Sequence, residues 1–251
     1  MKNRTKLAIS IVSHNQIKLV YELLHDIQAF CSSNFDLDIE IILTINISEN
    51  LIFNITDFLI PIKIIENISP RGFGENHNAA LKNNDSEFFC ILNPDIRLLN
   101  NPFNFLLKNF NDLTIGVLAP CITDSFGNIQ DSARKFPTPW SILNRALLNK
   151  HTPDYLIEKK IINPDWVAGM CMLFRAEVFK KLNGFDERFF LYCEDIDICA
   201  RVRLLNYRVI LDPRVSVIHN AQRDSHKSWR YLKWHISSLL RFFYKRYLGY
   251  Y

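Results

Sequence analysis

The chain carries the nonapeptide EFFCILNPD at residues 87–95, in which an apolar run stops at Asn93-Pro94-Asp95. A short apolar and aromatic run bounded by Asn and Pro is typical of a buried strand that ends in a turn. A carboxylate at the end of such a strand is well placed to hold a divalent cation, which takes oxygen ligands and bridges phosphates. Taken alone, the tripeptide is equally well explained as a plain turn.

Short β-branched runs and helical patterns alternate on the N-terminal side of this nonapeptide. We expect strands at residues 7–13, 39–45 and 62–65, and helices at residues 17–30 and 73–83. This alternation predicts βαβ units and a parallel sheet, in which ligands bind at the carboxyl ends of the strands. Ser13, Asn15 and Asn46 fall at such ends, as do Asn93 and Asp95.

The C-terminal side is less regular. We expect strands at residues 116–120, 166–174, 207–211 and 215–219, helices at residues 176–182 and 194–205, and a turn at residues 124–128. No internal repeat or clear linker interrupts this pattern. The sequence therefore predicts one domain over residues 1–222 and a C-terminal extension over residues 223–251.

A second acidic site, Glu194, Asp195 and Asp197, opens the helix expected at residues 194–205. Acidic residues in a first turn complement the helix dipole, and Asp197 with Arg201 has the spacing of an ordinary surface pair. Three carboxylates within four residues exceed what capping needs. Because close like charges raise the pKa of at least one of them, the cluster indicates a general base.

Composition excludes several classes of protein. The chain has 251 residues, 48% of them apolar, so it can bury a sizeable core. Its six cysteines form no Cys-x-x-Cys pair, so neither a zinc site nor a thioredoxin-like motif is indicated. The apolar run at residues 7–12 is too short for a signal peptide, and no stretch approaches a membrane span. We therefore expect a cytoplasmic protein with free thiols.

The tail is basic and amphipathic. From Arg223 to Tyr251 there are seven Lys and Arg residues against one Asp. On a helix, one apolar stripe would contain Trp229, Leu232, Ile236, Leu239, Leu240, Phe243, Tyr247 and Tyr250. Such aromatic, basic helices lie in membrane interfaces, although packing on the same domain or on a second subunit remains an alternative. No nucleic-acid-binding motif accompanies the charge.

Together these motifs resemble the inverting family-2 glycosyltransferases of the A-type fold, and among them the bacterial rhamnosyltransferase-type enzymes of surface-polysaccharide assembly. The resemblance covers roughly residues 7–225. Its matching segments, in family order, are residues 11–15 (IVSHN), 71–78 (RGFGENHN), 93–95 (NPD), 166–169 (WVAG), 184–190 (GFDERFF), 194–197 (EDID) and His219. It implies a mostly parallel central sheet with flanking helices, here followed by the amphipathic C-terminal helix.

The resemblance also implies residue roles. Asp95 matches the last position of the family's Asp-x-Asp metal motif, in which Asn93 replaces the first Asp, and His219 would complete a Mn²⁺ or Mg²⁺ site. Asp195 matches the catalytic base of the Glu194-Asp195 pair. The nucleotide and diphosphate would be surrounded by Ser13, Asn15, Asn46, Arg71 and Asn76, and the donor sugar would be bordered by Trp166 and Gly169.

The implied reaction is inverting sugar transfer, with rhamnose from dTDP-rhamnose as the expected donor sugar. The acceptor would be a saccharide linked to a lipid or polyprenyl diphosphate at the inner face of the bacterial inner membrane, in O-antigen or lipopolysaccharide assembly. One departure is that relatives usually have Asp-Asn-x-Ser where this chain has Ile45-Asn46-Ile47-Ser48. A UDP-hexose or UDP-galactofuranose donor and a catalytically silent scaffold are therefore alternatives. A nucleotidyltransferase and a homodimer are further alternatives that do not depend on this departure.

Overall fold

A computed structural model describes residues 4–31, 37–148, 152–220 and 229–249. Its N-terminal half follows the predicted alternation closely. The chain runs through β1 (Thr5–Ser13), α1 (Ile17–Cys31), β2 (Leu37–Ile45), the short helix η1 (Ile55–Asp57), β3 (Ile62–Glu66), α2 (Phe73–Leu81), β4 (Phe88–Leu92) and β5 (Ile96–Arg97). The apolar run of the nonapeptide is therefore a strand, and Asn93 to Asp95 follow its end.

The second half contains α3 (Phe103–Asn109), β6 (Ile115–Thr123), β7 (Ala133–Arg134), α4 (Pro139–Leu148), β8 (Trp166–Val167), β9 (Cys171–Arg175), α5 (Ala176–Lys181), α6 (Glu194–Leu204), β10 (Arg208–His219) and α7 (Trp229–Tyr247). The helices α3 and α4 had no counterpart in the sequence analysis.

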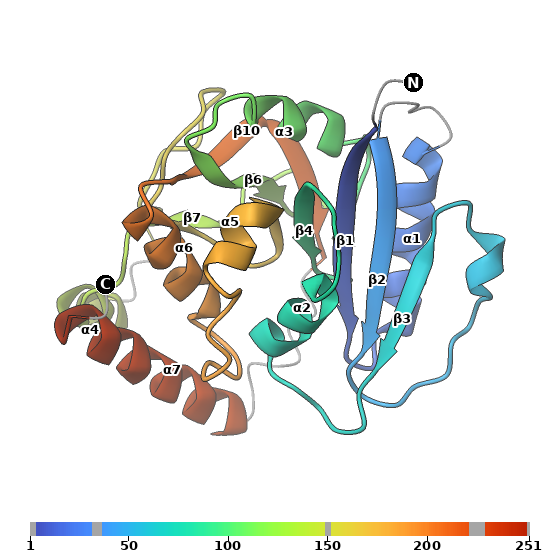
Figure 1. Ribbon diagram of the computed structural model, residues 1–251. Coiled ribbons are helices and arrows are strands. Elements are labelled where there is room, and N and C mark those ends of the chain that lie inside the picture. The colour runs from blue at the N-terminus through green and yellow to red at the C-terminus, as the bar shows by residue number, and fades with distance from the viewer. Residues whose placement is uncertain (1–3, 32–36, 149–151, 221–228, 250–251) are drawn as a thin grey trace.

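One curved eight-stranded sheet organises the molecule, in the order β3-β2-β1-β4-β9-β6-β10-β5 (Figure 1). The first four strands are parallel to one another, whereas β9 runs antiparallel to both of its neighbours, β4 and β6. The short strands β7 and β8 form a separate antiparallel pair. The predicted, mostly parallel sheet with flanking helices is confirmed.

Alternate residues of the central strands enter two hydrophobic cores. Leu7, Ile9 and Ile11 of β1 pack with α1 and α3 on one face of the sheet. On the other face, Ala8 lies in a core that includes side chains of α2, α5 and α6. This period-two alternation puts helices on both faces of the sheet, and it leaves the strand ends as the place for polar groups.

Two predicted strands have a different form in the structure. The stretch predicted as one strand at residues 166–174 is split into β8 and β9, because Ala168 to Met170 leave the ladder and the backbone amide of Gly169 turns toward Asp195. The two strands predicted at residues 207–211 and 215–219 are instead the single strand β10. Its register against β6 shifts between Asp212 and Ser216. Asp212-Pro213, which has the composition of a turn, is therefore part of a bulge within one strand.

Candidate active site

The carboxyl ends of β1, β2 and β4 border a cleft that encloses a cavity of about 290 Å³. Five residues predicted to bind the donor line it: Asn46, Arg71, Asn76, Asn93 and Asp95. The opposite wall comes from sequence-distant segments, through Phe190, Leu191, Arg230, Tyr231 and Trp234. The first turns of α7 are therefore part of the wall of the cleft, which the sequence pattern of the tail did not reveal.

An asparagine network shapes the loop that carries Arg71. The side-chain oxygen of Asn46 accepts hydrogen bonds from the Arg71 amide (2.8 Å) and from Asn67 (2.8 Å). Asn76 donates to the Gly72 carbonyl (2.9 Å) and accepts from Asn67 (2.7 Å). Asn46 and Asn76 are buried and hold this loop in place, while Arg71 is exposed at the cleft. Asn67 was missed, although it follows β3 at the same edge of the sheet.

Ser13 and Asn15 lie at the end of β1 but do not line the cavity. The hydroxyl of Ser13 donates to Glu49, which also accepts the backbone amides of Asn15 (3.2 Å) and Ile17 (3.0 Å). Glu49 thereby caps α1, so a carboxylate that no local pattern marks holds this loop in place. The neighbouring His14, not Ser13 or Asn15, reaches the cavity.

Asp95 and His219 come together at the junction of β4, β5 and β10. Asp95 Oδ2 lies 3.2 Å from His219 Nε2, and His219 Nδ1 is 2.8 Å from Gln130 Oε1. Because the Gln130 amide nitrogen donates to the His219 carbonyl, the Gln130 side-chain oxygen is the atom that accepts a hydrogen bond from Nδ1. Nε2 is then the ring nitrogen that faces the Asp95 carboxylate.

These two groups fit a divalent cation. The other carboxylate oxygen, Asp95 Oδ1, is buried without a hydrogen-bond partner among the described residues. A carboxylate with an orphaned oxygen beside an imidazole nitrogen is a donor set for Mn²⁺ or Mg²⁺. The described residues hold no group of three acidic, His or Cys side chains, so water or phosphate oxygens would have to supply the remaining ligands. Gln130, which orients the imidazole, was not predicted.

Asp195 lies in the first turn of α6. Its Oδ2 accepts the Gly169 amide (3.1 Å) and its Oδ1 accepts the Ile196 amide (2.8 Å). Burial raises the pKa of Asp195 to about 6, against the opposing effect of these amides and of the positive charge of Arg134. A carboxylate with this pKa is ionised at neutral pH and is still basic enough to accept a proton.

Glu194 is more deeply buried than Asp195, and its Oε2 has no partner among the described residues. Burial, and next the negative charge of Asp195, raise the pKa of Glu194 well above its ordinary value. Since Asp195 accepts two amide hydrogen bonds that stabilise its charge, the proton of the pair belongs on Glu194. The structure thus separates two carboxylates that the sequence analysis treated together.

The backbone before α6 presents these groups in an unusual way. Tyr192 and Cys193 both have left-handed conformations, with φ of +71° and +64°. Such conformations are uncommon for residues other than Gly, and consecutive ones cluster where a turn is fixed by its surroundings. Here the turn aims Asp195 at Gly169, where an added Cβ would lie 3.3 Å from the ring of Phe73. Trp166 lies nearby in β8, but its indole donates to the Lys135 carbonyl (3.0 Å).

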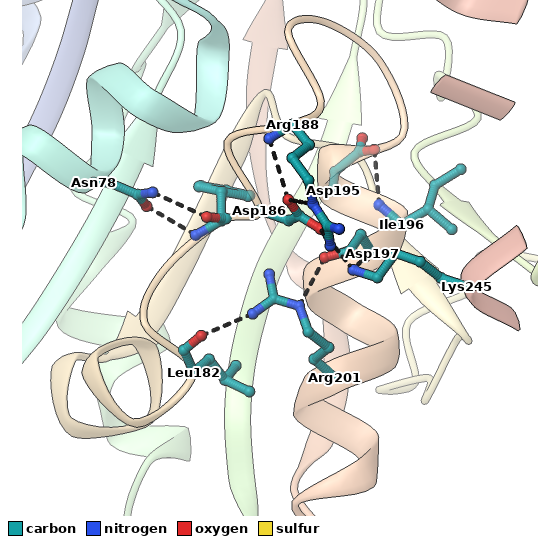
Figure 2. Close-up of polar contacts among 10 residues, drawn as sticks. Asn78, Leu182, Asp186, Arg188, Asp195, Ile196, Asp197, Arg201 and Lys245 are labelled. Carbon is teal, nitrogen blue, oxygen red and sulfur yellow. Dashed lines mark hydrogen bonds and ion pairs between the residues drawn. The ribbon is translucent and has the colours of Figure 1, made fainter. Parts of the chain in front are cut away.

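Asp197 has a different environment from Asp195, although only one residue separates them (Figure 2). It is fully buried, accepts a hydrogen bond from Arg201 (2.7 Å), and pairs with Lys245 of α7. Lys245 also pairs with Asp186 (2.9 Å), which is held in addition by Arg188. Figure 2 shows these cations converging on Asp186 and Asp197, away from Asp195.

Comparison with known proteins gives sequence relatives that include rhamnosyltransferases. The chain is 30% identical over 185 residues to the rhamnosyltransferase WbbL of Escherichia coli K12, a match that covers 68% of this chain and 69% of that protein. It is 29% identical over 146 residues to the N-acetylglucosaminyl-diphospho-decaprenol L-rhamnosyltransferase of Mycobacterium tuberculosis, covering 53% of this chain and 47% of that protein. No protein-family model matches the chain.

Solved structures with a similar fold are also glycosyltransferases. The mannosyltransferase PcManGT from Pyrobaculum calidifontis, in complex with GDP-Man and Mn²⁺, matches 96% of this chain and 65% of that chain with a TM-score of 0.62 and 16% identity. GalNAc-T7 with UDP, GalNAc and Mn²⁺ matches 87% of this chain and 44% of that chain with a TM-score of 0.64 and 16% identity. At these identities the likeness concerns the fold.

Proposed function

The chain belongs to the family-2, rhamnosyltransferase-like glycosyltransferases of the A-type fold, and from this premise we propose that it moves rhamnose from dTDP-rhamnose onto a lipid-linked saccharide with inversion at the anomeric carbon. Asp195 carries the proposal. Its carboxylate is held by two backbone amides and has a pKa raised to about 6. That combination suits a general base. Asp195 does not itself line the cavity that Phe73 and the residues predicted to bind the donor enclose, but the Gly169 whose amide it accepts packs on Phe73.

In this mechanism Asp195 accepts the proton of an acceptor hydroxyl. The acceptor oxygen attacks the anomeric carbon from the face opposite the nucleotide diphosphate, a new glycosidic bond forms, and the bond to the diphosphate breaks. Gly169 and Ile196 keep the carboxylate oriented through their amides. Protonated Glu194 stays neutral and avoids a second charge beside the base.

Asp95 and His219 would hold Mn²⁺ or Mg²⁺, with Gln130 fixing the imidazole. When bound, a divalent cation neutralises charge on the leaving diphosphate. Arg71 is exposed at the cleft, with its Nε 3.5 Å from Glu75 Oε1. Its guanidinium would also bind the diphosphate of the donor. The asparagine network presents the Arg71 loop for this contact.

The acceptor we propose is a saccharide on a polyprenyl diphosphate, presented at the inner face of the bacterial inner membrane for surface-polysaccharide assembly. The mycobacterial relative, an N-acetylglucosaminyl-diphospho-decaprenol L-rhamnosyltransferase, supports this choice. No helix in the part of the chain that the structure describes is long and apolar enough to cross a membrane. We keep residues 1–222 as the catalytic domain and residues 223–251 as an extension that brings it to the bilayer.

Ile45 leaves two candidate bases for the donor nucleotide, thymine and uracil. This side chain is buried at the end of β2 and offers no carboxylate where relatives usually have Asp, so UDP-hexose and UDP-galactofuranose are rival donors. The first experiment is the thermal stability of the purified protein with dTDP, UDP or GDP, each with Mn²⁺ or with EDTA. Specific binding stabilises by mass action, so a metal-dependent rise with dTDP alone is expected.

Transfer itself is tested with dTDP-rhamnose and a polyprenyl-diphospho-GlcNAc acceptor, comparing Asp95→Asn with Asp85→Asn. Asp85 is exposed on the loop between α2 and β4, remote from the cation ligands, so its variant should transfer normally. Asp95→Asn should lose the metal-dependent stabilisation and most of the transfer. Nucleotide binding without turnover on any acceptor would favour the silent scaffold, and a rise with UDP alone would replace the donor.

A further inference from the structure

Helix α7 packs on its own domain through residues that lie outside the predicted apolar stripe. Its buried residues are Ser238, Phe242 and Lys245, which are spaced along one face. The Ser238 hydroxyl donates to the Leu191 carbonyl (2.8 Å), and Phe242 lies in a small core with Phe189. A helix normally turns its apolar stripe inward, so this arrangement leaves the stripe in need of a partner.

The opposite face of α7 carries that stripe, and most of it is exposed to solvent. Trp229 is 86% exposed, Leu240 65% and Tyr247 58%, with Leu232 and Ile236 between them about half exposed. Leu239 and Phe243 are partly covered by the domain. Continuous apolar surface of this kind is characteristic of an interaction site rather than of ordinary solvent exposure.

Helix α4 exposes a second apolar stripe. Trp140 is 69% exposed and Leu147 72%, and Leu143 between them is nearly half exposed. These positions follow the spacing of one helical face. The sequence analysis did not detect this helix, and neither the donor cleft nor the cation site uses it.

The two helices lie at one corner of the molecule (Figure 1). Phe136, three residues before the start of α4, contacts Phe242 of α7 with a ring-centroid distance of 6.2 Å. The guanidinium of Arg246 lies over the same Phe136 ring at 4.8 Å. The start of α4 is therefore fixed beside the C-terminal half of α7.

Charge identifies the partner of this surface. Helix α7 contains no acidic residue, and α4 contains none either. Of the five Arg and Lys residues of α7, Lys245 is buried between Asp186 and Asp197, whereas Arg230 and Lys233 are exposed. Lys233 is exposed next to the apolar stripe. A second copy of the chain would bring two basic faces together, whereas an anionic bilayer attracts basic residues and accepts Trp and Tyr at its interface.

We infer that α7 and α4 form one lipid-docking surface, in which the outward stripes of both helices enter the headgroup region of an anionic bilayer. The choice of a bilayer rests in part on the proposed function, because a lipid-linked acceptor must be met at a membrane. The opposite side of α7 lines the cleft through Tyr231 and Trp234. Docking through the outer face of α7 would therefore place the cleft beside the membrane that carries the lipid-linked acceptor.

The test measures binding of the full chain to vesicles of phosphatidylethanolamine and phosphatidylglycerol by flotation, with phosphatidylcholine vesicles for comparison. The α7 variant is Leu232→Glu with Leu240→Glu, and the α4 variant is Trp140→Glu with Leu147→Glu. The control is Leu59→Glu with Leu113→Glu, which changes two exposed leucines outside both helices. Ser versions of the α7 and α4 variants serve if the Glu versions do not fold.

Wild type should bind the anionic vesicles and bind phosphatidylcholine weakly. The α7 variant should weaken binding about tenfold or more, because each lost 1.4 kcal/mol is a factor of ten. The α4 variant should weaken it severalfold, and the control should bind as wild type does. Normal binding by the α4 variant would remove α4 from the surface, and normal binding by the α7 variant would overturn the inference.

Sedimentation of the same proteins tests the rival occupant. One outcome would overturn the inference: wild type is a dimer, the Leu232→Glu and Leu240→Glu variant is a monomer, and neither protein binds vesicles. That outcome would assign the face to a second copy of the chain. The nucleotide-dependent thermal shift separates this inference from the proposed function. If the variants bind vesicles as predicted but no nucleotide stabilises the protein, the proposed function is wrong and the lipid-docking surface is still supported.

Discussion

Asp195 and Asp197 sit one residue apart in the first turn of α6 and occupy opposite kinds of environment. Asp197 is fully buried and contacts two cations, Arg201 and Lys245. Around Asp195 the protein supplies backbone amides and a more distant Arg134. A buried carboxylate paired with adjacent cations therefore has a structural role, whereas a buried carboxylate held mainly by backbone amides can keep enough proton affinity to act as a base.

The largest effect should come from Asp195→Asn. The amide cannot accept a proton from the acceptor, so we expect the transfer rate to fall about a thousandfold, within the range for loss of a general base. Stabilisation by nucleotide and Mn²⁺ should stay near that of wild type. Steady-state transfer and thermal shift measure the two quantities, and unchanged turnover would remove Asp195 as the base.

Asp197→Asn should instead act on stability. It leaves buried Lys245 without one of its two carboxylate partners, and breaking a buried ion pair from one side costs about 3 to 5 kcal/mol. Lys245→Met should be similarly costly. Denaturant unfolding should show that the double variant loses less than the sum of the two single losses, and strict additivity would mean that the pair does not couple α6 to α7.

The pH dependence sharpens the comparison further. The folded pKa of Asp195 is about 6, so the base is ionised above that pH and becomes protonated below it. The transfer rate should therefore fall as pH decreases through 6, by about tenfold for each unit below it. A rate profile at saturating donor and acceptor checks this. A flat profile down to pH 5 would show that Asp195 is not the titrating base.

The smallest predicted effect concerns Arg134, whose charge lowers the pKa of Asp195. Arg134→Met removes that charge, so the acid limb of the profile should move to higher pH by less than about one unit. Lys245→Arg keeps the charge near Asp197 and should leave the limb where it is in wild type. If the acid limb moved equally in both variants, the charges around Asp197 would influence Asp195 as strongly as Arg134 does.

The sequence determined the elements and the order of the chemistry along the chain. Short, nearly continuous apolar runs predicted β1, β2 and β4, and the polar residues that follow two of these strands, Asn46 and Asn93 to Asp95, border the cleft. Local signals were sufficient because a strand buried on both faces must be apolar and must end where polar groups begin.

Tertiary structure alone decided which polar residue does what. Gln130, Glu49 and Lys245 reach their partners across 89, 32 and 48 residues of chain, and no local pattern marks them. The same holds for the three carboxylates of α6 and for the two sides of α7. A carboxylate's pKa and a helix's inward face depend on what long-range packing brings beside them, and that neighbourhood is not written in the residues themselves.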